Sequence, residues 1–83
     1  MSVDPRQIQV GMDVFGIDGD EVGTVKEVRA TDILVNRPLA RDVYVPIEAV
    51  QAIMDATSHA VNPHVVLTIR ADSVGDMGWP HPS

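Results

Sequence analysis

The chain has 83 residues, a net charge of −6 and no cysteine. A chain this short buries only about 60% of the surface of its unfolded form, so we expect one domain with one small core. The lack of cysteine excludes disulfides, thiolate nucleophiles, iron–sulfur clusters and Cys-type zinc sites. The acidic balance argues against nucleic acid as the main partner, because affinity for phosphate backbones comes largely from Lys and Arg.

Neither a targeting nor a membrane-spanning segment is expected. Residues 1–6 lack a basic patch followed by an apolar run, and no apolar run approaches the roughly 20 residues of a spanning helix. We therefore expect a cytoplasmic protein with no membrane span. The domain is expected to cover residues 1–83, with a core over residues 7–80 and a tail over residues 81–83.

The first predicted strand covers residues 8–14, where apolar and polar side chains alternate. Phe15 and Ile17 shift the apolar set by one residue, and Gly16 between them predicts a bulge or bend of the kind that closes a small barrel. A hairpin turn follows at Asp18 and Gly19, because Asp-Gly is a strong signal for a turn with positive φ.

A second strand is predicted over residues 22–28. Its valines are spaced by three, which would suit a helix, but Gly23 and Thr24 are poor helix formers and the segment leaves a hairpin turn. We predict a strand with Gly23 as a bulge. Residues 33–35 and 43–45 are predicted to form the third and fourth strands.

The second half of the chain adds two further strands and short helical turns. Pro46 ends the fourth strand because it has no N–H to donate, and its fixed φ suits the start of a helical turn over residues 47–50. Residues 52–54 and 65–69 read as strands, and Asp72 or Ser73 is expected to cap a helical turn within residues 71–79. The fold class is thus all-β: a small barrel or roll of five to six short antiparallel strands with one or two helical turns, since crossover helices are missing.

Together, the strand over residues 8–14, the Asp18–Gly19 turn, the run over residues 22–25 and the segment over residues 43–50 resemble the PRC-barrel superfamily. The closing Met77, Gly78 and Trp79 with following prolines look like a small stand-alone bacterial family of unknown function. The resemblance covers roughly residues 7–80. It implies a PRC-type β-barrel module that contacts other macromolecules, as in a photosynthetic reaction-centre subunit and in ribosome-maturation factors. It brings no catalytic residue, and because we expect no counterpart of the membrane helix of the former or the second domain of the latter, neither partner is carried over.

Charge is unevenly distributed along the chain. Residues 1–25 and 42–83 each carry −4, whereas residues 26–41 carry +2. The basic side chains of that middle segment are Lys26, Arg29, Arg37 and Arg41. Two interpretations stay open: a solvated face with local ion pairs, or a docking surface for an acidic partner such as a second copy of the chain.

Two of the three aromatic side chains invite a functional interpretation. Trp79 is expected either to fold back as a lid over one end of the barrel or to anchor an interface. Tyr44 should point to the face opposite Val43 and Val45, where its hydroxyl can reach solvent or a partner.

The sequence contains no convincing constellation for catalysis or metal binding. His59, His64 and His81 fit no standard metal spacing, and the acidic cluster at residues 18–21 lacks the ligand pattern of a calcium loop. Ser58 beside His59 is a sequence neighbour only, with no sign of an oxyanion site. We expect no catalysis, no cofactor and no bound metal.

The leading hypothesis is a non-catalytic interaction module that self-associates or docks onto a protein partner. A small domain with unavoidable strand edges gains from pairing or covering them. The alternatives are a small-ligand or metal-binding regulator that uses the histidines or a barrel mouth, and an RNA- or ribosome-associated adaptor, which the acidic total opposes. The expected interface residues are Lys26, Arg29, Arg37, Arg41, Tyr44 and Trp79.

Overall fold

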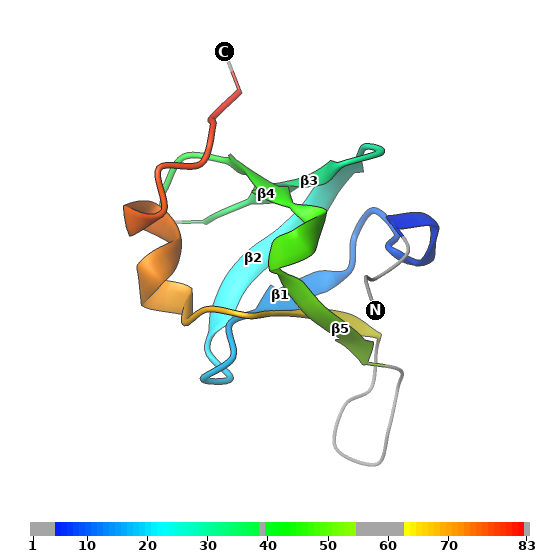
Figure 1. Ribbon diagram of the computed structural model, residues 1–83, viewed down its shortest axis with the longest axis horizontal. Coiled ribbons are helices and arrows are strands. Elements are labelled where there is room, and N and C mark those ends of the chain that lie inside the picture. Colours follow the sequence, from blue (N-terminus) through cyan, green and yellow to red (C-terminus); the bar gives the residue numbers. More distant parts are fainter. Residues whose placement is uncertain (1–4, 39, 55–62, 83) are drawn as a thin grey trace.

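The computed structural model describes residues 5–38, 40–54 and 63–82 (Figure 1). Its strands form one curled sheet in the order β4-β3-β2-β1-β6-β5, a half-barrel that confirms the expected all-β class. Three short 3₁₀ helices complete the described secondary structure. The strands are β1 (Asp13–Phe15), β2 (Glu21–Val28), β3 (Asp32–Asn36), β4 (Val43–Pro46), β5 (Val50–Met54) and β6 (His64–Leu67). The 3₁₀ helices are η1 (Pro5–Gln7), η2 (Ile47–Ala49) and η3 (Ala71–Asp76).

The sheet is mostly antiparallel, as expected, but it contains one parallel pair. All neighbouring strands run antiparallel except β1 and β6, which are parallel. The reason lies at Pro46 and η2, where the chain turns a corner from β4 into β5 instead of reversing in a hairpin. The β5–β6 hairpin then brings β6 alongside β1 in the same direction. In the part of the chain that the structure describes, no helix is both long and apolar enough to cross a bilayer.

The N-terminal strand is much shorter than predicted. Residues 9–12 form a turn, in which the N–H of Met12 donates to the carbonyl of Gln9 (3.2 Å) and Gly11 has a φ of +96°. A positive φ at the third position suits a type II turn. Val10 therefore projects outward and is 66% exposed, although the apolar alternation had placed it in a strand. Both Gly11 and Met12 bond to Val25, so two residues face one in a bulge.

The predicted hairpin turn at Asp18 and Gly19 is confirmed, but its chemistry differs from the expectation. The N–H of Gly16 donates to Asp20 (2.9 Å), which encloses a three-residue loop, and Gly19 has a φ of +87°. Asp18 does not adopt a positive φ. Its carboxylate instead accepts the N–H of Asp20 (3.4 Å) and that of Ala71 (3.3 Å).

Gly23 lies at the predicted bulge. Val14 pairs with Gly23 and Phe15 pairs with Glu21, so Val22 is the extra residue and the irregularity falls on β2 rather than at Gly16. Gly23 also lies against β3, and a Cβ there would collide with the carbonyl oxygen of Asn36. The close approach of these two strands requires a residue without a side chain.

Buried aliphatic side chains fill the concave side of the half-barrel. Ile33, Val35, Val43, Val45 and Val65 are at most 1% exposed, which fits inward-facing residues on alternating positions of β3 and β4 and on β6. Trp79 and Ile69 pack against this core from the C-terminal part of the chain. At about 25 cal/mol per Å² of buried apolar area, such side chains supply most of the stability of a domain this small.

The helical turns agree with the sequence-based predictions only in part. η2 begins directly after Pro46, whose φ of −64° suits a helix start, as predicted. η3 begins after Arg70, so the expected caps Asp72 and Ser73 lie inside it, and Arg70 makes no side-chain capping bond. The free N–H of Ala71 is instead satisfied by the carboxylate of Asp18, far away in the sequence.

Candidate functional site

Tyr44 lies on the convex face of the sheet, on the edge strand β4. It lies between the fully buried Val43 and Val45 and is itself half-buried, so it points outward as predicted. Its cross-strand partner Leu34 is only 5% exposed although it is not part of the inner core cluster. The guanidinium of Arg29 lies 4.5 Å from the centre of the Tyr44 ring, which is cation–π geometry.

Two of the four basic side chains are neutralised within the chain. The Nε of Arg29 lies 2.7 Å from Oδ1 of Asp32, and the Nζ of Lys26 lies 3.2 Å from Oδ2 of Asp42. These are partly exposed pairs, each worth about 0–1 kcal/mol. For Lys26 and Arg29, the geometry favours the interpretation of a solvated face with local ion pairs.

The C-terminal residues lie along the outer edge of β4 (Figure 1, red against green). The backbone N–H of Tyr44 donates to the carbonyl of Pro80 (2.9 Å), and Nδ1 of His81 lies 2.7 Å from the carbonyl oxygen of Asp42. Trp79, just before them, packs against the core, which fits the lid, one of the two roles expected from the sequence. His81 thus contacts the domain, whereas the sequence had placed it in a free tail.

The structure therefore gathers most of the expected interface residues in one place. Lys26, Arg29 and Tyr44 are linked through β4, and the segment that carries Trp79 runs beside them. Whether they bind a partner stays a prediction.

The two remaining arginines are placed differently. Arg41 is exposed just before β4, whereas Arg37 is half-buried and reaches toward η3, where its Nη2 would lie 3.7 Å from a Cβ at Gly75. Neither has an ion pair within residues 5–38, 40–54 and 63–82. The unneutralised positive charge of the middle segment rests on these two side chains.

Asp18 has a shifted pKa, and the cause is structural. Burial raises the pKa of its carboxyl, but hydrogen bonds from the backbone N–H groups of Ala71, Asp20 and Asp18 itself lower it. Arg70 adds to this, with its Nε 3.8 Å from the carboxylate. The pKa of Asp18 is lowered overall, so this carboxylate fastens the hairpin turn to η3 and does not suit an acid or base.

The histidines do not come together among the described residues. The ring of His64 meets Phe15 edge to face, with centroids 5.1 Å apart at 87°, on the convex side of β1 and β6. His81 contacts Asp42, while His59 and the neighbouring Ser58 lie outside the described residues. Within the described ranges, no group of three or more His, Cys, Asp or Glu side chains is placed to hold a metal ion.

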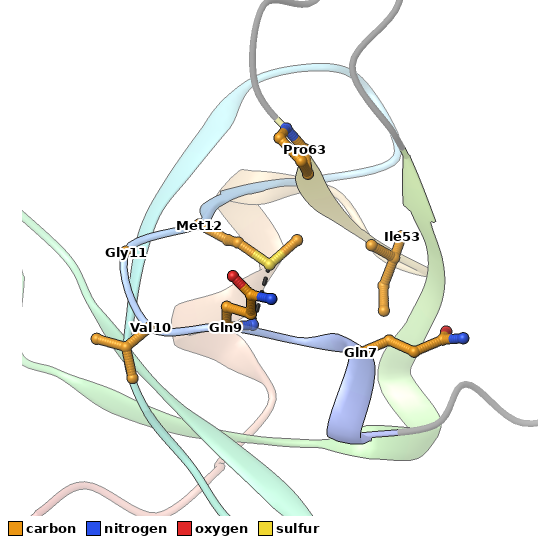
Figure 2. Close-up of a pocket in the computed structure, with 7 residues that line it drawn as sticks. All are labelled: Gln7, Gln9, Val10, Gly11, Met12, Ile53 and Pro63. Atoms are coloured by element: carbon orange, nitrogen blue, oxygen red, sulfur yellow. Dashed lines mark hydrogen bonds between the residues drawn. The ribbon is translucent and has the colours of Figure 1, made fainter.

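A pocket of about 580 Å³ opens at the mouth of the half-barrel (Figure 2). The turn at residues 9–12 forms one wall, and Ile53 of β5 lies across from it. The backbone N–H of Gln9 points at the sulfur of Met12 (3.0 Å), which holds that side chain back toward the turn. The residues that line it are uncharged: Gln7, Gln9, Val10, Gly11, Met12, Ile53 and Pro63. The sequence suggested a barrel mouth as a ligand site but did not identify these lining residues, because residues 8–12 were placed in a strand; Gly11 was the signal for the turn.

A comparison with protein-family models finds a match that covers most of the chain. The model described as "Uncharacterized protein conserved in bacteria (DUF2171)" matches residues 8–74, which include all six strands. The chain belongs to this family. The DUF2171 match ends at η3, so the segment on the β4 edge lies beyond it. No curated protein and no solved structure matches the chain. The prediction of a single domain over residues 1–83 stays a prediction.

Proposed function

We propose that this DUF2171 protein is a non-catalytic interaction module that binds protein through the surface around β4. We call this the β4 surface and define it as Lys26, Arg29, Arg41, Tyr44 and residues 79–81. The observation that carries the proposal is the convergence of Arg29, Tyr44 and the Trp79 segment at one sheet edge. Trp, Tyr and Arg are the residues that most often dominate binding energy at interfaces.

The charge distribution favours an acidic partner. Lys26 and Arg29 are paired within the chain, which leaves Arg41 of the β4 surface to attract an approaching carboxylate. Such attraction accelerates association and weakens as salt screens it over a Debye length of about 8 Å at physiological ionic strength. A second copy of this chain, with its net charge of −6, also offers acidic surface.

The proposal is tested by affinity capture from the native cytoplasm with the tagged full chain. We expect a distinct protein to be retained by the wild type at low salt and lost with Tyr44→Ala or Arg41→Gln. Arg70→Gln is the matched control, because it removes one exposed arginine outside the β4 surface. A partner lost equally with Arg70→Gln, or one indifferent to all three substitutions, would contradict the β4 surface.

A relationship to PRC-barrel modules and a cytoplasmic location belong to the same proposal. The relationship is supported by the curled sheet and by the passage from Val43–Pro46 through a single 3₁₀ turn into β5. The RNA- or ribosome-associated role is the less favoured version, because two of the four basic side chains are already paired. Loss of the captured partner after ribonuclease treatment would favour it over protein docking.

A small-ligand regulator is the second candidate function, and the pocket at the barrel mouth favours it. Its volume of about 580 Å³ lies within the range of about 300–1,000 Å³ typical of small-molecule sites. The uncharged lining with two Gln side chains suits a neutral, mainly apolar ligand. N-phenyl-1-naphthylamine is a suitable neutral probe: fluorescence that rises on binding and falls with Ile53→Gln would support the candidate, and no rise at any concentration would remove it.

A further inference from the structure

The two edge strands of the sheet, β4 and β5, differ in whether another segment of the chain covers them. On β4, the outward N–H of Tyr44 and the outward carbonyl of Asp42 are both occupied by the C-terminal segment, and Pro46 has no N–H. Pro80 and Pro82 cannot donate either, so this segment ends the sheet. Along the outer edge of β5, no comparable covering segment is found in the described part of the chain. An uncovered edge strand is a template for pairing with another chain.

The hydrogen-bonding pattern identifies which groups of β5 point outward. The N–H of Thr68 donates to Ala49, so the polar backbone groups of Thr68 face β5, and alternation turns those of Val66 and His64 the same way. Their partners Ala52 and Met54 then bond to β6. Ile53, opposite Val65, lies in the intervening pair and directs its N–H and C=O toward the outer edge.

The side chains beside this edge are mostly apolar, with the exposed Gln51 on β5 and His64 opposite Met54 as the polar exceptions. On the convex face, Ala52, Val66 and Phe15 are half-buried and Met54 is 43% exposed. β5 carries no Asp, Glu, Lys or Arg. Two copies with a charge of −6 repel each other over acidic surface, so a neutral strand is where they approach at the lowest electrostatic cost.

We propose that two copies of the chain pair through β5, antiparallel, about a two-fold axis at Ile53. Ile53 and the partner's Ile53 then exchange both N–H···O bonds, and Ala52 lies opposite the partner's Met54 on the convex face. On both sides of the axis the small side chain of Ala52 faces the large side chain of the partner's Met54, so the exposed methionines are covered without a clash. This inference rests on the proposed function as an interaction module and adds the self-association surface.

Disulfide cross-linking tests the register, because the chain contains no cysteine of its own. Directly opposed residues in a non-hydrogen-bonded pair have Cα atoms about 4.5 Å apart, within disulfide reach, whereas diagonal neighbours lie about 7–8 Å apart. Ala52→Cys and Met54→Cys proteins, mixed and oxidised with copper phenanthroline, should give a disulfide-linked dimer. Each variant oxidised alone is the matched control and should stay largely monomeric. Equal cross-linking in all three samples would overturn the register.

Sedimentation of the full chain over a range of concentrations tests the self-association itself. We expect a monomer–dimer equilibrium that is lost with Ala52→Glu/Met54→Glu, which sets like charges opposite each other. Ala52→Lys/Met54→Glu should restore it, because each Lys then faces a Glu of the partner. Melting temperatures confirm that both variants fold.

The outcomes separate this inference from the proposed function. A wild-type chain that stays monomeric at all concentrations overturns the β5 dimer, as does a dimer that both double variants retain. In either case capture of a partner through the β4 surface is unaffected, since Tyr44 and Arg41 lie at the opposite edge of the sheet. If the dimer is lost with Tyr44→Ala and kept by the β5 variants, the dimer interface is the β4 surface and the β5 inference is wrong.

Discussion

Gly23→Ala should strongly destabilise the protein, because Gly23 lies where β2 and β3 approach each other closely. A Cβ at this position would collide with the carbonyl oxygen of Asn36, which belongs to the backbone of β3 and has no flexible side chain to move aside. The strands must separate at the pair that joins Thr24 and Asn36. Overpacking typically costs about 1–3 kcal/mol, and each weakened backbone hydrogen bond costs about 1 kcal/mol more.

We therefore expect Gly23→Ala to lower the free energy of unfolding by about 2–4 kcal/mol. A domain of this size has a total stability of about 4–12 kcal/mol, so the loss is a large share. At about 4–8 °C per kcal/mol, the melting temperature should fall by roughly 10–30 °C. Thermal unfolding followed by circular dichroism, with urea titration for the free energy, measures both.

Gly75→Ala is the matched control for this change. Its Cβ would meet only Nη2 of Arg37, at an ordinary contact distance of 3.7 Å, and its φ is not positive. We expect a change within about 1 kcal/mol of zero, stabilising if reduced freedom of the unfolded chain dominates. If both variants melt together, or if Gly23→Ala melts with the wild type, the close approach of β2 and β3 is refuted.

Three further predictions follow from the core, the hairpin turn and the convex face. Leu67→Ala, at a fully buried position, should lower the free energy of unfolding in urea by about 2–5 kcal/mol. Val10→Ala, at an exposed position, should lower it by less than about 0.5 kcal/mol. Equal losses would contradict the placement of Val10 outside the core. Because the pKa of Asp18 is lowered in the folded state, its carboxylate stabilises the protein above pH 3.8, the ordinary pKa of the group, and this effect is lost as the pH falls through the lower folded-state pKa. The melting temperatures of the wild type and Asp18→Asn should therefore differ at pH 6 and converge on acidification. A difference that stays constant with pH would contradict the lowered pKa of Asp18. Tyr44→Ala should cost about 1–3 kcal/mol by removing the ring that faces Arg29, whereas Tyr44→Phe should keep most of the stability in the same urea titration.

Much of the fold followed from local rules. The strands around residues 33–35 and 43–45, the turn at Gly19 and the corner at Pro46 were all predicted, because alternation and turn chemistry are set by neighbouring residues. The first strand failed for an equally local reason. Gly11 with a positive φ interrupts an alternation that, counted by hydrophobicity alone, continues through Val10.

The sequence predicted which residues belong to the candidate site but not how they are placed relative to one another. The basic middle segment was evident from charge, but the sequence could not tell which side chains would be neutralised. Lys26 pairs with Asp42, which lies 16 positions away, and such pairings depend on strand register rather than on composition. The outward direction of Tyr44, by contrast, followed from its position between two core valines.

What the sequence by itself determined is the all-β class, the positions of the main strands and turns, and the lack of thiol chemistry. Only the tertiary structure decided which sheet edge is covered, that β1 and β6 are parallel, and that Asp18 supplies the cap for η3. His81 meets Asp42 across 39 positions and Asp18 meets Ala71 across 53. Contacts at such separations depend on how the whole sheet closes, which local propensity does not encode, because strand order is a property of the assembled backbone.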